Sequence, residues 1–192
     1  IGMLYEGDGR PRIDQKGVEN VNGYLFMLCT GTLFSSLFPP LQLFFRGLAL
    51  ARREAASGAY GLPLSVLAMQ LADIVLQQAL PCVFVSVTYR LIDPRHGLEQ
   101  RLGAFLLVAQ AIAFAGASLG YLIACLSPDS EFATVVAPLF VFPMILLGGL
   151  YANVGAIPAG ARWINKVNPI NYGFQAVSQA QWFSTVSEPS TR

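Results

Sequence analysis

Charged residues are scarce in this sequence, and the scarcity is concentrated in long stretches. Only 12% of the 192 residues are Asp, Glu, Lys or Arg, about half of the ~25% that is usual in a soluble domain. Residues 20–45, 102–128 and 132–161 contain no charged side chain. A helix needs about 20 predominantly apolar residues to cross the hydrocarbon core of a bilayer. The sequence therefore predicts an integral membrane protein with several spanning helices and excludes an ordinary soluble domain.

The few charges and cysteines exclude other classes of protein. The formal net charge is +1, so no basic face is available to neutralise phosphates, and nucleic acid is not an expected partner. Cys29, Cys82 and Cys125 each lie within an apolar stretch, which favours small core residues over a disulfide framework or a metal site. Ile1 is not followed by the charged segment and cleavage site of a signal peptide, so we expect a piece of a longer chain.

Residues that carry catalytic chemistry are also missing. A phosphate-binding loop needs a lysine followed by serine or threonine, but Lys16 precedes Gly17 and Lys166 precedes Val167. His96 is the single histidine, and its place in a charged segment indicates a solvated side chain rather than a base or a metal ligand. We therefore expect no catalytic, cofactor or metal site in this chain, and a membrane enzyme is the least favoured class.

The apolar stretches predict an all-α bundle of membrane-spanning helices. Pro39 and Pro40 lie near the end of the first predicted span and should kink or fray it, because proline lacks the backbone donor of a helix interior. Pro138 and Pro143 interrupt the last predicted span. The predicted spans are residues 21–45, 64–89, 102–126 and 132–151.

Small residues recur at helical spacing in the third predicted span. Ala113 with Ala117, and Gly116 with Gly120, form overlapping pairs four residues apart. Such pairs let two helix backbones approach closely in lipid, where apolar helices have no hydrophobic reason to associate. The pattern indicates helix packing and says nothing about a substrate.

Two polar segments are expected on one side of the bundle. Residues 46–60 contain good helix formers and are expected to form a short amphipathic helix at the membrane surface, followed by a break at residues 61–63. Residues 127–131 are expected to form a tight turn, with Ser127 or Ser130 as the N-cap of the next helix.

The polar segments on the other side differ in composition. Residues 6–20 and 90–101 are interpreted as loops because they carry glycine, proline and charge. Residues 153–183 place aromatic rings beside polar groups, which suits the membrane interface. We interpret this last segment as short interfacial or re-entrant helices, followed by a polar tail at residues 184–192.

One predicted span carries a polar face. Gln70, Asp73 and Gln77 are spaced so that they share one side of a helix. A charge inside a membrane is costly, and it usually marks a functional site such as a substrate or proton path. The alternative is a polar face that joins this helix to its neighbours, and we favour it because Asp73 lies only two or three turns from the end of the span.

The order of several short motifs resembles the membrane domain of the G subfamily of ATP-binding-cassette transporters, the White-type half transporters. The resemblance covers residues 1–183, and the shared order and spacing of the motifs make it specific. The motifs are residues 22–26 (NGYLF), 33–36 (LFSS), 53–60 (REAASGAY), 70–73 (QLAD), 117–120 (ASLG), 148–153 (GGLYAN) and 168–174 (NPINYGF).

The resemblance implies an architecture and partners for the whole protein. In that family a half transporter has one nucleotide-binding domain followed by six membrane helices, and two halves form a dimer. This chain then corresponds to the end of the first helix through the fifth, with a coupling helix and an external re-entrant segment. ATP and magnesium are expected in the nucleotide-binding domain, outside this chain. The expected partners are that domain, a second half transporter, membrane lipid and an apolar small-molecule substrate.

The resemblance also implies roles for individual residues. Without it, the phenylalanines among them would be interpreted as lipid-facing or core side chains. The stretch that lines a central cavity at the dimer axis corresponds to Thr30, Gly31 and Phe34, and its facing wall to Phe142, Met144 and Ile145. The apolar plug above the cavity corresponds to Leu150 and Tyr151, and the coupling helix to Arg53, Glu54, Ser57, Gly58 and Tyr60.

This chain departs from the family pattern where charged residues are common in other members. Gly47 follows Arg46 where many members carry acidic residues, and Met69 takes the place of a lysine. Asn171 and Gln175 occupy positions where arginine and glutamate are common. These changes remove charged partners that the resemblance would otherwise imply.

Two orientations in the membrane are in conflict. The resemblance places residues 46–60 and 127–131 inside the cell, although the positive-inside rule favours the side with more Lys and Arg. We follow the resemblance, because the parts of the family outside this chain largely set topology. The family's inner side has Arg46, Arg52 and Arg53, and the outer side has Arg10, Arg12, Lys16, Arg90, Arg95, Arg101, Arg162 and Lys166.

The preferred hypothesis is a multi-pass membrane protein of the plasma membrane or an organelle, forming the membrane half of an exporter for lipid-like or amphipathic substrates. Alternating access would carry the substrate. The rival class is a passive channel or a membrane scaffold without transport. A channel should show polar stripes on several spans, and we find one only on the span that contains Asp73.

Overall fold

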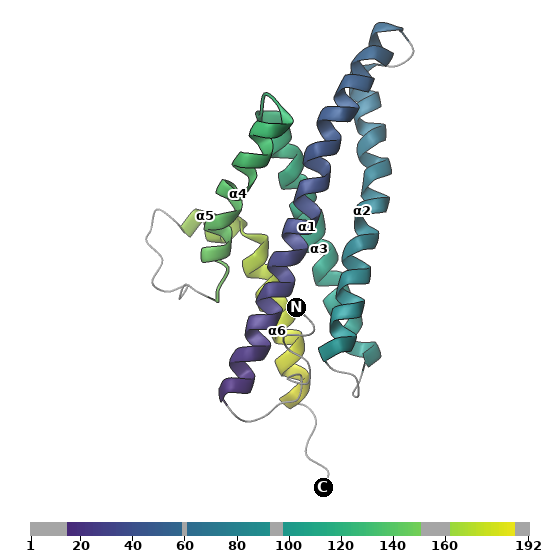
Figure 1. Ribbon diagram of the computed structural model, residues 1–192. Helices are drawn as coiled ribbons and strands as arrows, with labels where there is room; N and C mark the ends of the chain where they lie inside the picture. Colours follow the sequence, from purple (N-terminus) through teal and green to yellow (C-terminus); the bar gives the residue numbers. More distant parts are fainter. Residues whose placement is uncertain (1–14, 59–60, 93–97, 151–161, 187–192) are drawn as a thin grey trace.

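The computed structural model describes residues 15–58, 61–92, 98–150 and 162–186. Most residues in these ranges form α-helices, and none of them is in a strand, which confirms the all-α prediction (Figure 1). The helices are α1 (Gln15–Ala56), α2 (Leu62–Ile92), α3 (Leu98–Leu126), α4 (Ser130–Leu146), α5 (Arg162–Val167) and α6 (Pro169–Val186).

The first three helices are long and apolar enough to cross a membrane. The qualifying segments are Glu19–Ala56, Leu62–Thr88 and Leu102–Leu126. Helix α4 has 17 residues, about 25 Å of helix, so it is shorter than the predicted span 132–151 and falls slightly below the ~30 Å of a hydrocarbon core. The helices alternate in direction, which brings the α1–α2 hairpin and the α3–α4 turn to the same end of the bundle (Figure 1).

Helix α1 is the centre of the bundle and packs against α2, α3, α4 and α6. Its buried residues recur every three or four positions, as expected for one face of a helix. Leu25, Leu28, Leu33, Leu37 and Leu41 are at most 1% exposed. The core of the described part therefore runs along one side of α1.

The small residues of α3 face this buried side of α1. A side-chain carbon at Gly116 would lie 2.9 Å from the backbone oxygen of Leu33. One at Gly120 would clash with the backbone oxygen of Leu37. Only glycine allows so close an approach of two backbones, so the prediction that these residues pack helices together is confirmed.

Helix α1 is longer than predicted at both ends. It begins at Gln15, inside the expected loop 6–20, and continues through Pro39 and Pro40 to Ala56. A separate amphipathic helix over residues 46–60 was therefore a wrong prediction. Leucine, alanine, arginine and glutamate dominate after Gly47, and these residues favour continuation of a helix. The helix ends where Gly58 adopts a φ of 77°, which glycine accepts without strain.

Two other predicted boundaries are also corrected. The expected loop 90–101 is shorter, because α2 continues to Ile92 and α3 begins at Leu98. The N-cap of α4 is Asp129, whose side chain accepts a hydrogen bond of 2.7 Å from the backbone N–H of Phe132. Ser127 instead donates to the backbone oxygen of Ile123 over 2.7 Å.

The segment after α4 returns to the bundle. Gly149 has a φ of 95° and turns the chain beyond α4. Helix α5 lies within the segment 153–183 that was expected to form short helices, and α6 begins there but continues to Val186, three residues into the predicted tail. However, α6 has 18 residues and lies beside the first half of α1 (Figure 1), with Ile170 and Val177 fully buried. The polar tail prediction concerns residues 184–192, of which those after Val186 lie outside the described ranges.

Candidate functional site

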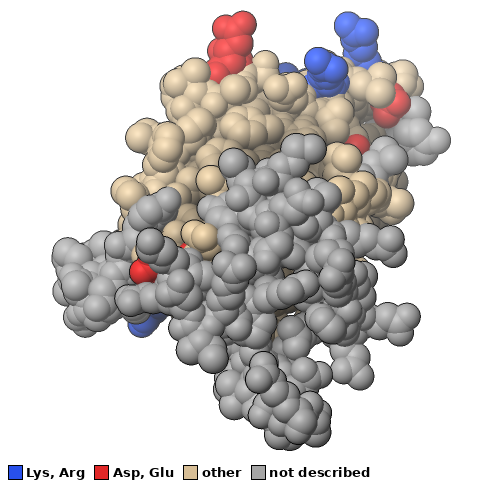
Figure 2. All heavy atoms as spheres, turned by 60° about the horizontal axis from the view of Figure 1, so that its bottom comes forward, with Lys and Arg blue, Asp and Glu red and all other residues tan. Residues whose placement is uncertain are grey.

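The described charges gather at one end of the molecule. In Figure 2, which brings the opposite end forward, most of the coloured Lys, Arg, Asp and Glu side chains lie at the upper margin, and a few lie at the left side below it. This distribution suits helix ends in water and helix centres in lipid. The charged residues at the end with the α1–α2 hairpin and the α3–α4 turn are Arg46, Arg52, Arg53, Glu54, Asp129 and Glu131.

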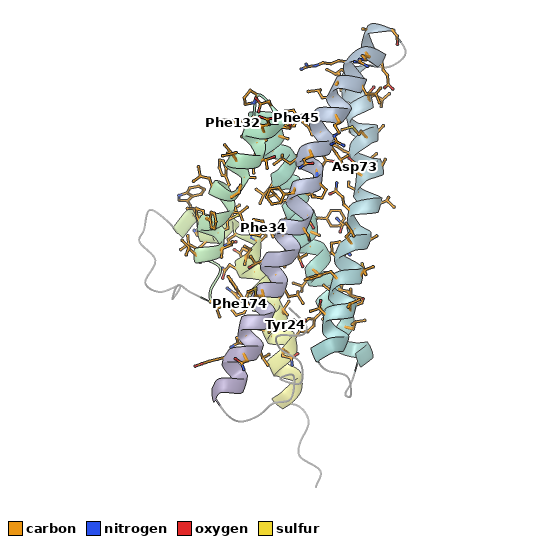
Figure 3. All side chains as sticks on the ribbon, in the orientation of Figure 1. Tyr24, Phe34, Phe45, Asp73, Phe132 and Phe174 are labelled. Atoms are coloured by element: carbon orange, nitrogen blue, oxygen red, sulfur yellow. The ribbon has the colours of Figure 1, made fainter. Side chains whose placement is uncertain are left out.

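The predicted cavity residues on α1 lie on a face that the other helices only partly cover. Thr30, Gly31 and Phe34 are half-buried, whereas the neighbouring leucines Leu33 and Leu37 are fully buried. The ring of Phe34 stacks on that of Phe38, with 6.1 Å between their centroids. The Thr30 hydroxyl oxygen is buried and has no hydrogen-bond partner in the described structure. This part of α1 therefore combines two stacked, half-buried aromatic rings with a buried polar atom, and Phe34 is labelled in Figure 3.

The predicted facing wall on α4 is divided between two environments. Phe142 is 59% exposed and points away from the core. Met144 and Ile145 are partly buried and pack against the core. In a single chain, Phe142 is therefore the one of these three that is available to another molecule.

The predicted plug lies at the end of α4. Leu150 is exposed, and Tyr151 lies outside the described residues. Gly148 is buried, and a side-chain carbon there would lie 2.7 Å from the Phe26 ring and 2.9 Å from Ile170. The space around Gly148, where the chain leaves α4, therefore accommodates only glycine.

Asn168 fixes this region, and the sequence analysis assigned it no such role. Its side-chain amide donates to the backbone oxygen of Met144 over 2.7 Å. Its amide oxygen accepts from the backbone N–H of Ile170 over 3.1 Å. Asn168 is fully buried, so it caps the start of α6 and satisfies a terminal carbonyl of α4 at once. The Asn-Pro pair was a signal of this cap, because Pro169 suits the first position of a helix.

The remaining motif residues of α6 pack against the bundle. Gly173 lies against Ile112 of α3, and a side-chain carbon there would clash with the Ile112 side chain. Phe174 meets Phe26 of α1 edge-on, with 5.8 Å between ring centroids. Tyr172 is exposed, and its hydroxyl donates to the backbone oxygen of Lys166 over 3.1 Å.

Two family departures on α6 contact each other. The side-chain amide of Gln175 donates to the side-chain oxygen of Asn171 over 3.0 Å. The two positions for which the resemblance implied arginine and glutamate are thus joined here by a neutral hydrogen bond on one helix face.

The polar face of α2 packs toward the rest of the bundle. The Tyr121 hydroxyl of α3 donates to Asp73 Oδ2 over 3.1 Å, and Gln77 is buried while Gln70 is half-buried. The Tyr121 ring also meets Phe44 of α1 edge-on at 6.4 Å. The contact links three helices at the depth of Asp73 (Figure 3). It supports the interpretation of this face as a polar join between helices.

A second polar contact joins α2 and α3 two to three turns farther along the two helices. The side-chain amide of Gln110 donates to the backbone oxygen of Gln78 over 3.0 Å and also contacts the sulfur of Cys82. A lone glutamine in an apolar span was the available signal for this contact, because buried amides require partners.

The predicted coupling residues lie on the last turn of α1 and in the turn that follows. Arg53 is exposed and Glu54 is half-buried. The Ser57 hydroxyl donates to the backbone oxygen of Glu54 over 2.8 Å, and Gly58 provides the positive φ that ends the helix. Tyr60 lies outside the described residues.

These features define a class of protein before any comparison. Three long apolar helices and a polar contact paired between two of them, all within the described residues, are the features of a multi-pass integral membrane protein. Residues 1–182 match the family model described as ABC-2 type transporter. The chain belongs to this family, and its relatives are half transporters of the G subfamily.

The relatives include proteins from insects, a nematode and a plant. The chain is 30% identical over 182 residues to Protein white of Drosophila melanogaster, covering 95% of this chain and 26% of that protein. It is 27% identical over 163 residues to ABC transporter G family member 7 of Arabidopsis thaliana, covering 85% and 22%. It is 25% identical over 168 residues to the ABC transporter ATP-binding protein/permease wht-1 of Caenorhabditis elegans, covering 86% and 24%. The chain thus spans about a quarter of the length of these relatives.

Proposed function

We propose that this chain is the membrane half of an ATP-driven exporter that carries lipid-like or amphipathic substrates between two half transporters. The observation that supports the proposal most strongly is the family match over residues 1–182 in a chain whose α1 leaves an aromatic face partly uncovered. Aromatic and apolar side chains with few polar groups are typical of sites for apolar ligands. Phe34 and Phe38 provide such a surface.

Helices α1 and α4 form the two walls of the proposed path. They face each other across a groove lined by Phe45 of α1 and Val135 of α4. Phe34 lies eleven positions before Phe45, about three helical turns, so both rings lie on the same side of α1. Phe142 lies seven positions after Val135 and therefore shares its side of α4. The substrate would contact Phe34 and Phe142, and a second half transporter would close the cavity.

ATP and magnesium would be held outside this chain. The name of the nematode relative wht-1 includes an ATP-binding protein as well as a permease. Neither lysine of this chain is followed by serine or threonine, so the phosphate-binding loop belongs to another part of the protein. The role of this chain is to bind the substrate and to change its conformation when the nucleotide-binding domains close.

The end of α1 would receive that movement. Helix α1 is continuous from the cavity residue Phe34 to Glu54, about 30 Å of helix. A continuous helix transmits a displacement along its length, whereas a separate surface helix would need a joint. Arg53 and Glu54 therefore serve as the contact with the nucleotide-binding domain, at the end of a lever that reaches the cavity.

A passive channel is the weaker candidate. Its polar stripe would need to face an open pore, but Asp73 is engaged by Tyr121 and Gln77 is buried. We therefore assign this face to helix packing.

The cavity is tested in the full-length protein, reconstituted into liposomes with a fluorescent short-chain lipid as substrate. Phe34→Ala should reduce ATP-dependent transport several-fold while the protein inserts normally. Phe114→Ala is the matched control, because Phe114 is an exposed ring on α3 outside the proposed path. Equal transport by both variants would remove Phe34 from the cavity.

The coupling segment is tested by ATP hydrolysis in the same preparation. Glu54→Ala should reduce the stimulation of hydrolysis by substrate, because the contact that links α1 to the nucleotide-binding domain is weakened. Glu19→Ala removes an exposed acid at the other end of the same helix and serves as the control. Stimulation that is unchanged by Glu54→Ala would exclude the coupling role.

A further inference from the structure

A charged groove lies between α1 and α4, nearer to the α1–α2 hairpin than the predicted cavity residues. Its volume is about 470 Å³, which is large enough for a ligand head group. The wall from α1 is formed by Gln42, Phe45 and Arg46, and the wall from α4 by Ser130, Glu131, Thr134 and Val135.

The two walls carry opposite charges that do not neutralise each other. Arg46 and Glu131 are both exposed, and the described contacts of the chain include no ion pair between them. Thr134 already donates its hydroxyl to the backbone oxygen of Ser130 over 2.7 Å. The groove therefore presents a guanidinium on one wall and a carboxylate on the other, and both remain available to a ligand.

Beyond the groove, α1 carries a row of half-buried phenylalanines. Phe34, Phe38 and Phe45 recur at intervals of four and seven residues, so they form one stripe along the helix. The distance along the axis from Phe45 to Phe34 is about 16 Å, which is comparable to the length of an extended acyl chain or a fused-ring body. Along α1, the side chains are thus charged or polar at the groove and aromatic beyond it.

We propose that this groove binds the head group of a zwitterionic amphiphile, with the anionic group on Arg46 and the cationic group on Glu131. The apolar body of the ligand lies along Phe38 and Phe34. The inference rests on the proposed transport function and specifies its substrate class. The resemblance implies acidic residues just after this first span, and the arginine at position 46 departs from that pattern.

A ligand of one charge fits the groove less well. An anionic head would pair with Arg46 but would be repelled by the carboxylate of Glu131. A cationic head would pair with Glu131 but would be repelled by the guanidinium of Arg46. Because both side chains are exposed to solvent, each contact is worth only a modest free energy. We therefore expect a preference of about two- to fivefold in affinity rather than absolute selection.

The test measures binding to the full-length protein in dodecyl maltoside, whose head group carries no charge. Three fluorescent probes share one alkyl tail and differ in the head: phosphocholine, phosphate or trimethylammonium. The phosphocholine probe should bind two- to fivefold more tightly than either of the others. A diacyl phosphatidylcholine probe with short chains, compared with the single-chain probe, distinguishes a membrane lipid from a free amphiphile as the natural source of the head group.

Two variants separate the contributions of the charges. Arg46→Gln should remove the preference for phosphocholine over trimethylammonium. Glu131→Gln should remove the preference for phosphocholine over phosphate. Arg52→Gln deletes an exposed arginine on another side of α1 and should leave the order of affinities unchanged.

The outcomes also distinguish this inference from the proposed function. Equal affinity for the three heads, or an order that both groove variants leave intact, would overturn the zwitterion site. ATP-dependent transport of an uncharged fluorescent amphiphile by the same protein tests the exporter separately. If this transport is observed but the groove binds the three heads equally, only the proposed substrate class is refuted. If the groove is selective but no ATP-dependent transport is observed, only the exporter function is refuted.

Discussion

The sulfur of Met69 fills the space beside Gly47 where any larger residue would place its first side-chain carbon. Gly47 lies on α1 and Met69 on α2, so the contact holds the two helices of the projecting hairpin together. The resemblance implied charged residues near these positions, and this chain instead has apolar packing between a glycine and a flexible thioether.

This contact makes Gly47 sensitive to any side chain. Gly47→Val should lower the free energy of unfolding by about 1–3 kcal/mol, because the added methyl groups overlap the Met69 side chain. Thermal unfolding of the full-length protein in detergent measures the effect. Combining the change with Met69→Ala should restore much of the loss. If the double variant loses as much free energy of unfolding as the two single variants together, the two residues do not pack against each other.

The approach of α3 to α1 gives a second prediction, at Gly120. Gly120→Ala should destabilise the protein by about 1–3 kcal/mol, because the new methyl group meets the backbone oxygen of Leu37, which cannot rotate away. Gly103→Ala is the matched control on the same helix, since no atom lies within 4 Å of the added carbon. Similar unfolding temperatures for the two variants would contradict the close packing of α1 and α3.

The role of Asp73 is decided by comparing stability with transport. Tyr121→Phe and Asp73→Asn should each cost about 0.5–1.5 kcal/mol, as for other hydrogen bonds between membrane helices. The double variant should lose less stability than the sum of the two single variants, because the same hydrogen bond is lost in all three proteins. Transport of an uncharged substrate should survive in all three variants. Loss of transport in Asp73→Asn alone would instead indicate a substrate or proton path.

Asn168 is expected to be the most sensitive polar residue of the α4–α6 connection. Asn168→Ala should reduce stability by about 2–4 kcal/mol, since it removes two hydrogen bonds and leaves the buried carbonyl of Met144 without its donor. Asn165→Ala tests a neighbouring half-buried amide whose side-chain oxygen has no partner in the described structure. Equal and small effects of the two changes would show that Asn168 does not fix the connection.

Much of the fold could be predicted from the distribution of charge. The third predicted span, 102–126, coincides with the segment Leu102–Leu126 that is long and apolar enough to cross a membrane, because charged residues precede it and a Pro-containing turn follows it. The first span was underestimated. The sequence marks where charge begins at Arg46, but charge does not end a helix, and alanine and leucine carry α1 on to Ala56.

The contacts of the site were less accessible to sequence reasoning. The spacing of Gln70, Asp73 and Gln77 predicts a shared helix face, but not the partner Tyr121, which is 48 residues away in the chain. The groove between Arg46 and Glu131 likewise depends on how α1 and α4 pack. The predicted roles of Phe34 and Phe142 stay predictions, because the cavity assigned to them requires a second half transporter.

The central claim is that this chain forms part of a pump and not a passive pore. The most direct measurement is accumulation of a fluorescent amphiphile in sealed liposomes that contain the full-length protein. The account predicts accumulation against a concentration gradient when ATP is hydrolysed, and none when hydrolysis is blocked. Equilibration of the probe across the membrane at the same rate with and without ATP would contradict it.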